Sequence, residues 1–134
     1  MKLSRASVYA ILSTIQLSES ASSPPLPCSQ LAKLGDMPER FLLQVLRSLV
    51  THDILLSTRG VDGGYRLARP LSQITLLDII TATEGRLEAD SERVVGLSSP
   101  SQQRLADLLS QIASDTRKRL ASFTLAELKP ASTR

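Results

Sequence analysis

The sequence has little of the chemistry that enzymes and metal sites need. Its 134 residues include one cysteine, Cys28, and one histidine, His52. A single cysteine excludes an intrachain disulfide, and one histidine beside it cannot complete a Cys/His zinc site. We find no nucleophile elbow, no phosphate-binding glycine loop ahead of a helix and no pairing of histidine with a carboxylate. We therefore expect neither an enzyme nor a protein with a metal or another cofactor.

Aromatic residues and long apolar runs are also scarce. The four aromatic residues are two Tyr and two Phe, so the core must be built from aliphatic side chains, which favours helix-on-helix packing. Residues 8–17 come closest to a secretion signal, but Ser13, Thr14 and Gln16 interrupt the run and indicate an amphipathic helix instead. No segment reaches membrane-spanning length. Together with the lone cysteine, this suits a cytoplasmic protein without a membrane partner.

The positive charge is concentrated in the first half of the chain. Residues 1–70 hold 8 Lys and Arg against 5 Asp and Glu, whereas residues 71–134 hold 8 of each. The net charge of +3 therefore comes from the first half alone. A local basic excess of this kind suits a surface that contacts phosphates.

Three helices are predicted in the first half. The pattern predicts helices over residues 2–18, 28–34 and 38–51, with a Ser/Pro-rich linker over 19–27. Gly35 is expected to end the second helix, and Asp36 to cap the third. Two short helices joined by a tight turn with a glycine form a helix-turn-helix.

The third helix has two distinct faces. Its apolar face consists of Leu42, Val45, Leu46 and Leu49. Its polar stripe consists of Arg40, Gln44, Arg47 and Thr51, and Leu43 borders that stripe. Any surface helix shows a solvated polar face, but the place of this one in the motif favours contact with DNA.

A hairpin follows the helix-turn-helix. Residues 54–58 and 65–68 are β-like, and the Asp-Gly-containing turn between them is typical of a hairpin. After a helix-turn-helix, such a hairpin is a wing. We expect Arg59, Gly63, Gly64 and Tyr65 to belong to its DNA-binding part. The fold class is therefore predicted as mainly α, a winged helix-turn-helix with a two-stranded wing.

The second half adds two helices. A capped helix is predicted from Thr75 to Glu84-Gly85, then a polar loop over 86–100 and a long helix over 101–121. Residues 122–129 are expected to add a short element, and Pro130 begins a tail. The long helix carries an apolar stripe predicted to hold a homodimer together: Leu105, Leu108, Leu109, Ile112 and Leu120. We divide the chain into a DNA-binding domain at 1–85 and a dimerisation segment at 86–134, packed as one compact unit.

Motifs in a fixed order resemble one bacterial family. They are LSRASVYA at 3–10, FLLQVL at 41–46, RGVDGGYRLAR at 59–69, ITLLDII at 74–80 and Glu84-Gly85. In this order they are similar to the Rrf2 family of winged helix-turn-helix regulators, which includes the iron–sulfur cluster regulator and the nitric-oxide-sensing repressor. The resemblance implies a symmetric dimer, a recognition helix in the major groove and a wing that reaches the minor groove. It also implies DNA contacts by Arg40, Leu43, Gln44 and Arg59.

The sequence departs from this family at its sensor. Iron–sulfur members carry three cysteines in the loop after Glu-Gly, but residues 86–100 contain no Cys and no His. We therefore expect no cluster of the family type. Arg40 and Leu43 also differ from the residue types of well-known members, so the operator sequence cannot be transferred.

The sequence predicts a DNA-binding transcription regulator of repressor type, acting as a homodimer on a palindromic operator. Two alternatives stay open. Cys28 opens a short helix and could act as a thiol-redox switch, although a small, partly buried core residue is the simpler interpretation. A winged-helix module that binds only proteins is the other, and the arginines of the polar stripe and wing argue against it. The effector and the regulated genes are left open.

Overall fold

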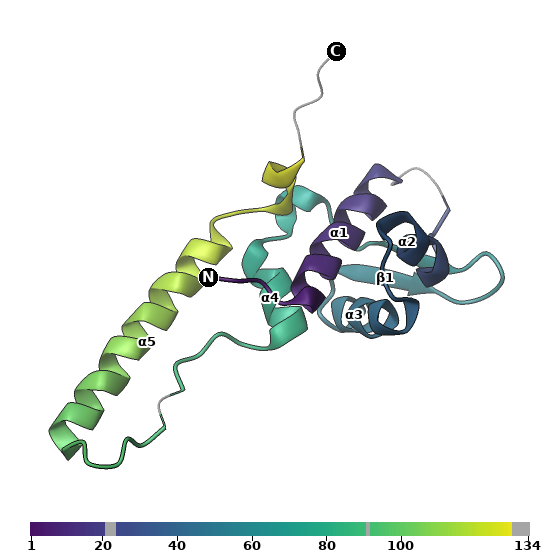
Figure 1. Ribbon diagram of the computed structural model, residues 1–134. Coiled ribbons are helices and arrows are strands. Elements are labelled where there is room, and N and C mark those ends of the chain that lie inside the picture. The colour runs from purple at the N-terminus through teal and green to yellow at the C-terminus, as the bar shows by residue number, and fades with distance from the viewer. Residues whose placement is uncertain (21–23, 91, 130–134) are drawn as a thin grey trace.

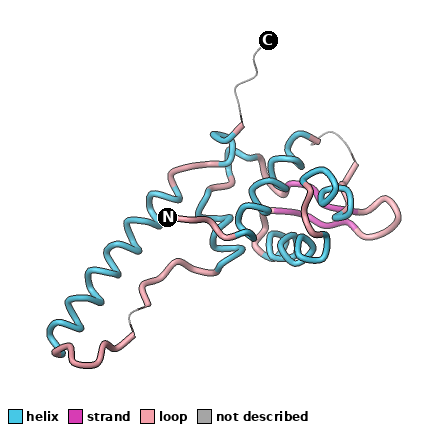
Figure 2. The backbone as a smooth tube through the Cα atoms, viewed as in Figure 1, coloured by secondary structure: helices cyan, strands magenta, loops and turns pink. Residues whose placement is uncertain are grey.

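A computed structural model describes residues 1–20, 24–90 and 92–129. Its elements form a winged helix-turn-helix body from which one long helix projects (Figures 1 and 2). In chain order they are α1 (Arg5–Glu19), α2 (Cys28–Gly35), α3 (Glu39–Thr51), β1 (Leu55–Thr58), β2 (Gly64–Leu67), η1 (Leu71–Gln73), α4 (Leu76–Glu84), α5 (Ser99–Ala121) and η2 (Leu125–Leu128). The predicted fold class, mainly α with a two-stranded wing, is confirmed.

The first helix begins later than predicted because a serine caps it. The Ser4 hydroxyl accepts a hydrogen bond from the Ser7 backbone N–H at 3.1 Å. Such a cap satisfies one of the free N–H groups of the first turn and fixes the start of the helix at Arg5. The predicted start at residue 2 is therefore wrong by three residues.

The turn between α2 and α3 is organised differently from the prediction. Asp36 does not cap α3: it adopts a left-handed conformation with φ 51° and ends α2. The Met37 N–H bonds back to the Ala32 carbonyl at 2.8 Å, which closes the turn. Pro38 precedes α3, and no side chain caps that helix. The prediction that Asp36 caps α3 is wrong. The backbone of Asp36 ends α2 instead, and its carboxylate makes no capping hydrogen bond with α3.

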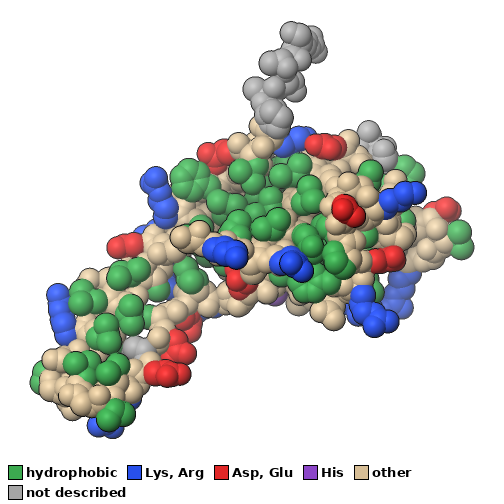
Figure 3. Space-filling model, viewed as in Figure 1, with side chains coloured by type: hydrophobic (Ala, Val, Ile, Leu, Met, Phe, Trp, Pro, Cys, Tyr) green, Lys and Arg blue, Asp and Glu red, His purple; other side chains and the backbone are tan. Residues whose placement is uncertain are grey.

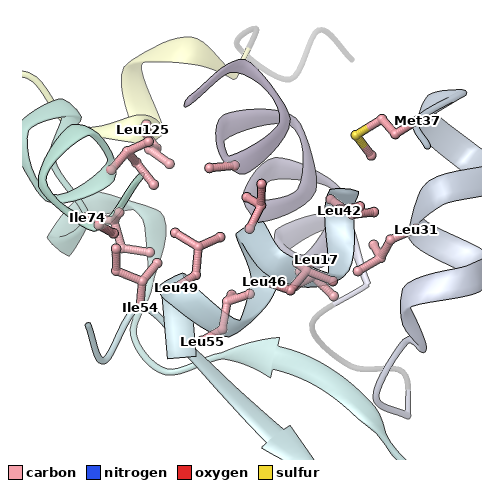
Figure 4. Packing of buried hydrophobic residues seen from close by; sticks show 14 of the residues in the cluster. Leu17, Leu31, Met37, Leu42, Leu46, Leu49, Ile54, Leu55, Ile74 and Leu125 are labelled. Atoms are coloured by element: carbon pink, nitrogen blue, oxygen red, sulfur yellow. The ribbon is translucent and has the colours of Figure 1, made fainter. Parts of the chain in front are cut away.

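A continuous aliphatic core lies between α1, α3, α4 and the wing. Leu42, Leu46 and Leu49 of α3 are fully buried and point into it (Figure 4). Ile54, which lies between α3 and β1, and Ile74, which follows η1, extend the core toward α4. Burial of these side chains removes apolar area from water, the dominant stabilising contribution to folding.

The wing is an antiparallel hairpin with an additional partner. Leu55 pairs with Leu67, and Thr58 pairs with Gly64. Leu26 of the predicted linker forms a further antiparallel bridge with Tyr65. The linker therefore aligns with the hairpin instead of only connecting two helices. Its residues 21–23 and the predicted tail from residue 130 lie outside the described residues.

Helix α4 begins and ends where the sequence predicts. Thr75 and Asp78 form a reciprocal capping box, and Gly85 follows the last turn with φ 87°. Arg69, just after the wing, makes a 3.3 Å ion pair with Asp78. This pair connects the end of the wing to the start of α4.

The long helix α5 projects from the body, and the chain then returns to it (Figure 1). It begins at Ser99, two residues before the predicted start, because Ser98 caps it and Pro100 fits its first turn. After α5, the Leu125 N–H donates to the Ile74 carbonyl at 2.8 Å, and the Leu125 side chain is fully buried. Residues 125–128 therefore complete the core of the N-terminal half. The boundary at residue 85 stays a prediction.

None of the helices in the described part of the chain combines the length and the apolar character needed to cross a bilayer.

Candidate nucleic-acid interface

Helix α3 presents a polar face to solvent. Arg40, Gln44, Arg47 and Thr51 are all exposed, and Leu43 beside them is half-buried. The opposite face is anchored in the core through Leu42, Val45, Leu46 and Leu49. The apolar contacts therefore fix the rotation of the helix and hold the polar stripe outward.

The wing places a further cation near this helix. Arg59 follows β1 directly and is exposed. The turn closes with a 3.0 Å hydrogen bond from the Gly63 N–H to the Gly60 carbonyl. In Figure 3, Lys and Arg side chains gather at the lower edge of the molecule, between α3 and the wing.

Gly63 and Gly64 have a structural role that the sequence does not specify. A Cβ on Gly63 would lie 2.2 Å from the Thr58 carbonyl oxygen, and one on Gly64 would lie 2.4 Å from the Leu26 carbonyl group. Their missing side chains therefore allow close approach within the wing itself. A direct contact of either glycine with DNA stays a prediction.

An open groove of about 510 Å³ separates α3 from the wing. Residues of the polar stripe and of the strands line it: Arg47, Val50, Thr51, Ser57, Thr58, Arg59, Gly64 and Tyr65. Sequence reasoning identified five of these and missed Val50, Ser57 and Thr58. Ser57 and Thr58 stand directly before Arg59 in β1, and this position in the sequence is the signal that could have identified them as lining residues.

Tyr65 lies between the linker and the groove. Its backbone exchanges two hydrogen bonds with Leu26, of 2.8 and 3.1 Å. Burial raises the pKa of the Tyr65 phenol, the neighbouring Cys28 raises it further, and the charge of Arg47 opposes both effects. Tyr65 is therefore a neutral group within electrostatic reach of Arg47.

Cys28 is half-buried at the start of α2, as the simpler interpretation expects. Its thiol donates a hydrogen bond to the Glu39 carbonyl, with a sulfur–oxygen distance of 3.6 Å. Burial raises the pKa of the Cys28 thiol, and the negative charge of Glu39 raises it further. The thiol is therefore protonated at neutral pH, which lowers its reactivity.

The projecting helix carries exposed apolar side chains. Leu108 is 38% exposed and Ile112 is 59% exposed, and Leu105 and Leu109 are half-buried beside them. Leu120 differs from these four, because it is only 8% exposed in the single chain and belongs to that chain's own packing. The preceding loop adds exposed Val94, Val95 and Leu97, which sequence reasoning did not select.

Residues 86–98, where they are described, are held by protein contacts. The Arg117 guanidinium donates to the Leu87 carbonyl. The Gln102 side chain accepts from the Val94 N–H at 3.0 Å and donates to the Glu92 carbonyl at 3.3 Å. Within the described ranges, no three His, Cys, Asp or Glu side chains are placed to hold a metal ion.

Comparison with known proteins places these features in a family. A model of the Rrf2 family, described as an iron-dependent transcriptional regulator, matches residues 3–131. The donor set of this chain does not fit an iron–sulfur cluster in the loop after Gly85, because that loop has no thiol or imidazole and the one thiol lies in α2.

Relatives in sequence cover nearly the whole chain. Rv1287 of Mycobacterium tuberculosis strain H37Rv carries a provisional name as an HTH-type transcriptional regulator. It is 32% identical over 133 residues, and the match covers 96% of this chain and 81% of the relative. The similarly named slr0846 of Synechocystis is 30% identical over 128 residues, 96% of this chain and 87% of the relative.

Solved structures agree with this assignment. CymR, the global cysteine regulator of B. subtilis, is 25% identical, with a TM-score of 0.71 over 96% of this chain and 95% of that one. IscR of T. potens, 24% identical, shares the fold with a TM-score of 0.69 over 99% and 94% of the two chains. The match over residues 3–131, together with the winged helix-turn-helix fold, makes this chain a member of the Rrf2 family of DNA-binding transcription regulators, which are not enzymes.

Proposed function

We propose that this chain acts in the cytoplasm as a homodimer that binds a palindromic operator in double-stranded DNA and represses transcription there. One observation carries the proposal: four polar residues of α3 are exposed on one face, and Arg59 of the wing is exposed beside them. A helix fits the major groove of B-DNA, where base edges present distinct patterns of donors and acceptors.

The residues of this face suit different parts of DNA. The amide of Gln44 can pair with adenine through two hydrogen bonds, and Arg40 can reach guanine or a phosphate. Arg59 suits the negative potential of a narrow, A·T-rich minor groove. Major-groove contacts would then supply most of the sequence preference, and the affinity of the wing would depend on the width of the minor groove.

The exposed apolar side chains of α5 support the homodimer. Leu105, Leu108, Leu109 and Ile112 follow helical spacing on an element that projects from the body (Figure 1). Pairing with a second copy would remove this apolar area from water. A two-fold dimer places two recognition helices on half-sites about 10 bp, or a multiple of it, apart. Repression then needs no further contact, because a dimer on a promoter excludes polymerase by occupancy.

The two alternatives have less support. The raised pKa of the Cys28 thiol argues against a thiolate-based redox switch. A module that binds only proteins would have no need of the exposed arginines on α3 and the wing.

The direct test is selection of DNA by the purified full chain. Fragmented genomic DNA is incubated with the protein, and the bound fragments are sequenced. We expect one enriched motif with two-fold symmetry, and transcription in vitro from the enriched promoters should fall as protein is added. Enrichment without symmetry would contradict the palindromic operator, a rise in transcript would contradict repression, and no enrichment at all would contradict the proposed function.

A further inference from the structure

An open groove of about 260 Å³ lies between the segment that follows α4 and the long helix α5. Three residues of the segment and three of the helix line it: Arg86, Glu88, Ala89, Ser110, Ala113 and Arg117. Figure 1 shows this segment leaving α4 and running beside α5. The groove therefore lies where the winged helix-turn-helix body is joined to the helix that we assign to dimerisation.

Each wall of this groove carries a guanidinium group. Arg117 is half-buried on the helix wall, and its guanidinium donates to the Leu87 carbonyl. A guanidinium has five N–H donors in a planar fork, so this bond leaves others for a second acceptor. Arg86 is exposed on the opposite wall, and the hydroxyl of Ser110 adds a further donor. The groove therefore offers donors for oxygen atoms from both of its sides.

Glu88 indicates which chemical group Arg86 takes. The Glu88 Oε1 atom lies 3.0 Å from the Arg86 Nε atom. The two side chains are 61% and 72% exposed, so water screens this ion pair and a competing carboxylate can replace Glu88 at little cost. Two guanidinium groups against one carboxylate leave the described lining of the groove with a net positive charge. The lining therefore favours an anion that presents a carboxylate to each wall.

The groove uses a different face of α5 from the proposed dimer contact. Ser110, Ala113 and Arg117 follow one another at helical spacing. Because an α-helix turns by about 100° per residue, their mean direction lies about a third of a turn from the exposed apolar stripe between Leu105 and Ile112. A second copy of the chain on that stripe would therefore leave the groove accessible to a small molecule.

We infer that this groove binds a small organic dicarboxylate, one carboxylate on Arg86 and the other on Arg117, and that this ligand is an effector of DNA binding. The ligand replaces Glu88 on Arg86 and ties residues 86–89 to α5. Because these residues begin the connection between α4 and α5, occupancy changes how the body is held relative to the long helix. The binding site stands on the groove alone, whereas the effector role rests on the proposed function.

Isothermal titration of the full chain with succinate, at fixed ionic strength, tests the binding site. Arg86→Gln should weaken succinate binding by at least about tenfold, because it removes charge-assisted hydrogen bonds and leaves the contact of Arg117 with Leu87 intact. Glu88→Gln should tighten binding, because the competing carboxylate is lost. Arg104→Gln removes the same charge from another exposed position of α5 and should leave binding unchanged. The neutral diamide succinamide should not bind, and equal binding of sulfate would contradict a dicarboxylate.

A second measurement tests the effector role by comparing affinity for the selected operator with and without saturating succinate. We expect the affinity of the wild type to change by at least about fivefold and that of Arg86→Gln to stay constant. Succinate binding without this change would overturn the effector role. No succinate binding, or equal losses in Arg86→Gln and Arg104→Gln with circular dichroism matching the wild type, would overturn the site. Failure of the proposed function would look different, since the wild type would then bind no DNA even without succinate.

Discussion

Leu26 and Tyr65 exchange two backbone hydrogen bonds, so the segment before the helix-turn-helix and the second strand of the wing form one antiparallel bridge. The two residues are 39 positions apart, and the whole helix-turn-helix lies between them. The bridge therefore connects the entrance of the motif to its wing.

Gly64→Ala should weaken this bridge. Its Cβ would lie 2.4 Å from the Leu26 carbonyl carbon and oxygen, and backbone atoms cannot move aside as a flexible side chain can. We expect a loss of about 1–3 kcal/mol in the free energy of unfolding, measured by denaturant titration. Gly60→Ala is the matched control, because it also has a positive φ but meets nothing within 4 Å. Equal losses in the two variants would show that backbone strain, and not the contact with Leu26, is the cause.

Ile112→Asp should dissociate the proposed dimer. A charge on the exposed part of the α5 stripe would be desolvated in the interface, and the apolar contact would be lost. We expect the dissociation constant to rise by at least about tenfold, measured by sedimentation equilibrium. Gln111→Asp adds the same charge at an exposed neighbouring position and should leave the constant unchanged. A wild type that sediments as a monomer at micromolar concentration would contradict the dimer itself.

Gln44→Ala should relax specificity at one base position in each half-site. Loss of the two amide hydrogen bonds should cost about 1–3 kcal/mol with the preferred base pair and little with the others. Competition binding with operators substituted at each position provides the measurement. A loss that is the same for every sequence would mean that this side chain does not distinguish bases.

Arg59→Ala should weaken binding most on operators with A·T-rich flanks. A narrow minor groove has the strongest negative potential, and Arg59 is the exposed cation at the start of the wing turn. The salt dependence should decrease by about one unit per subunit. Titrations on A·T-rich and G·C-rich flanks would give this comparison, and unchanged affinity on both would assign Arg59 to the hairpin alone.

Cys28 should react slowly with thiol reagents. Burial and the charge of Glu39 raise its pKa above the ordinary value of 9.0, so at each pH the thiolate fraction is smaller than in an unfolded chain. The rate of modification should rise with pH and reach half its maximum above the pH found for the urea-unfolded chain. The effect on stability follows from this shift, because folding favours the protonated thiol. The contribution of the thiol to folding stability is complete below its pKa in the unfolded chain, and it is lost as the pH rises through its pKa in the folded chain.

Cys28→Ser should also leave DNA affinity unchanged in both peroxide and dithiothreitol. A peroxide-dependent loss of affinity in the wild type that disappears in Cys28→Ser would establish the redox alternative instead.

Sequence patterns correctly predicted the elements that are determined by residues close to one another in the sequence. The capping box of Thr75 and Asp78 and the turn between β1 and β2 are determined by residues close in sequence, and both were located correctly. Asp36 was assigned wrongly because the same carboxylate next to the same glycine suits either the end of one helix or the start of the next. Only the sign of its φ decides between them, and this angle depends on the packing of the whole turn.

Contacts between distant segments were not predictable from these patterns. Leu26 lies among prolines, so nothing in its vicinity indicates a strand partner. Ser57 and Thr58 are ordinary strand residues until the fold places α3 opposite them. The stripe on α5 was predicted as one set, but Leu120 lies where the helix meets its own body, and helical periodicity cannot distinguish that packing from contact with a second chain.

The position of Leu125 has a consequence for biosynthesis. This side chain fills the core beside Ile74 (Figure 4), but it leaves the ribosome only after the whole of α5 has been made. A nascent chain that ends before Leu125 has an incomplete core in its N-terminal half, which costs about 2–5 kcal/mol for a buried leucine. A chain truncated before Leu125 should therefore lose stability in its winged helix-turn-helix, although every residue of that motif is still present.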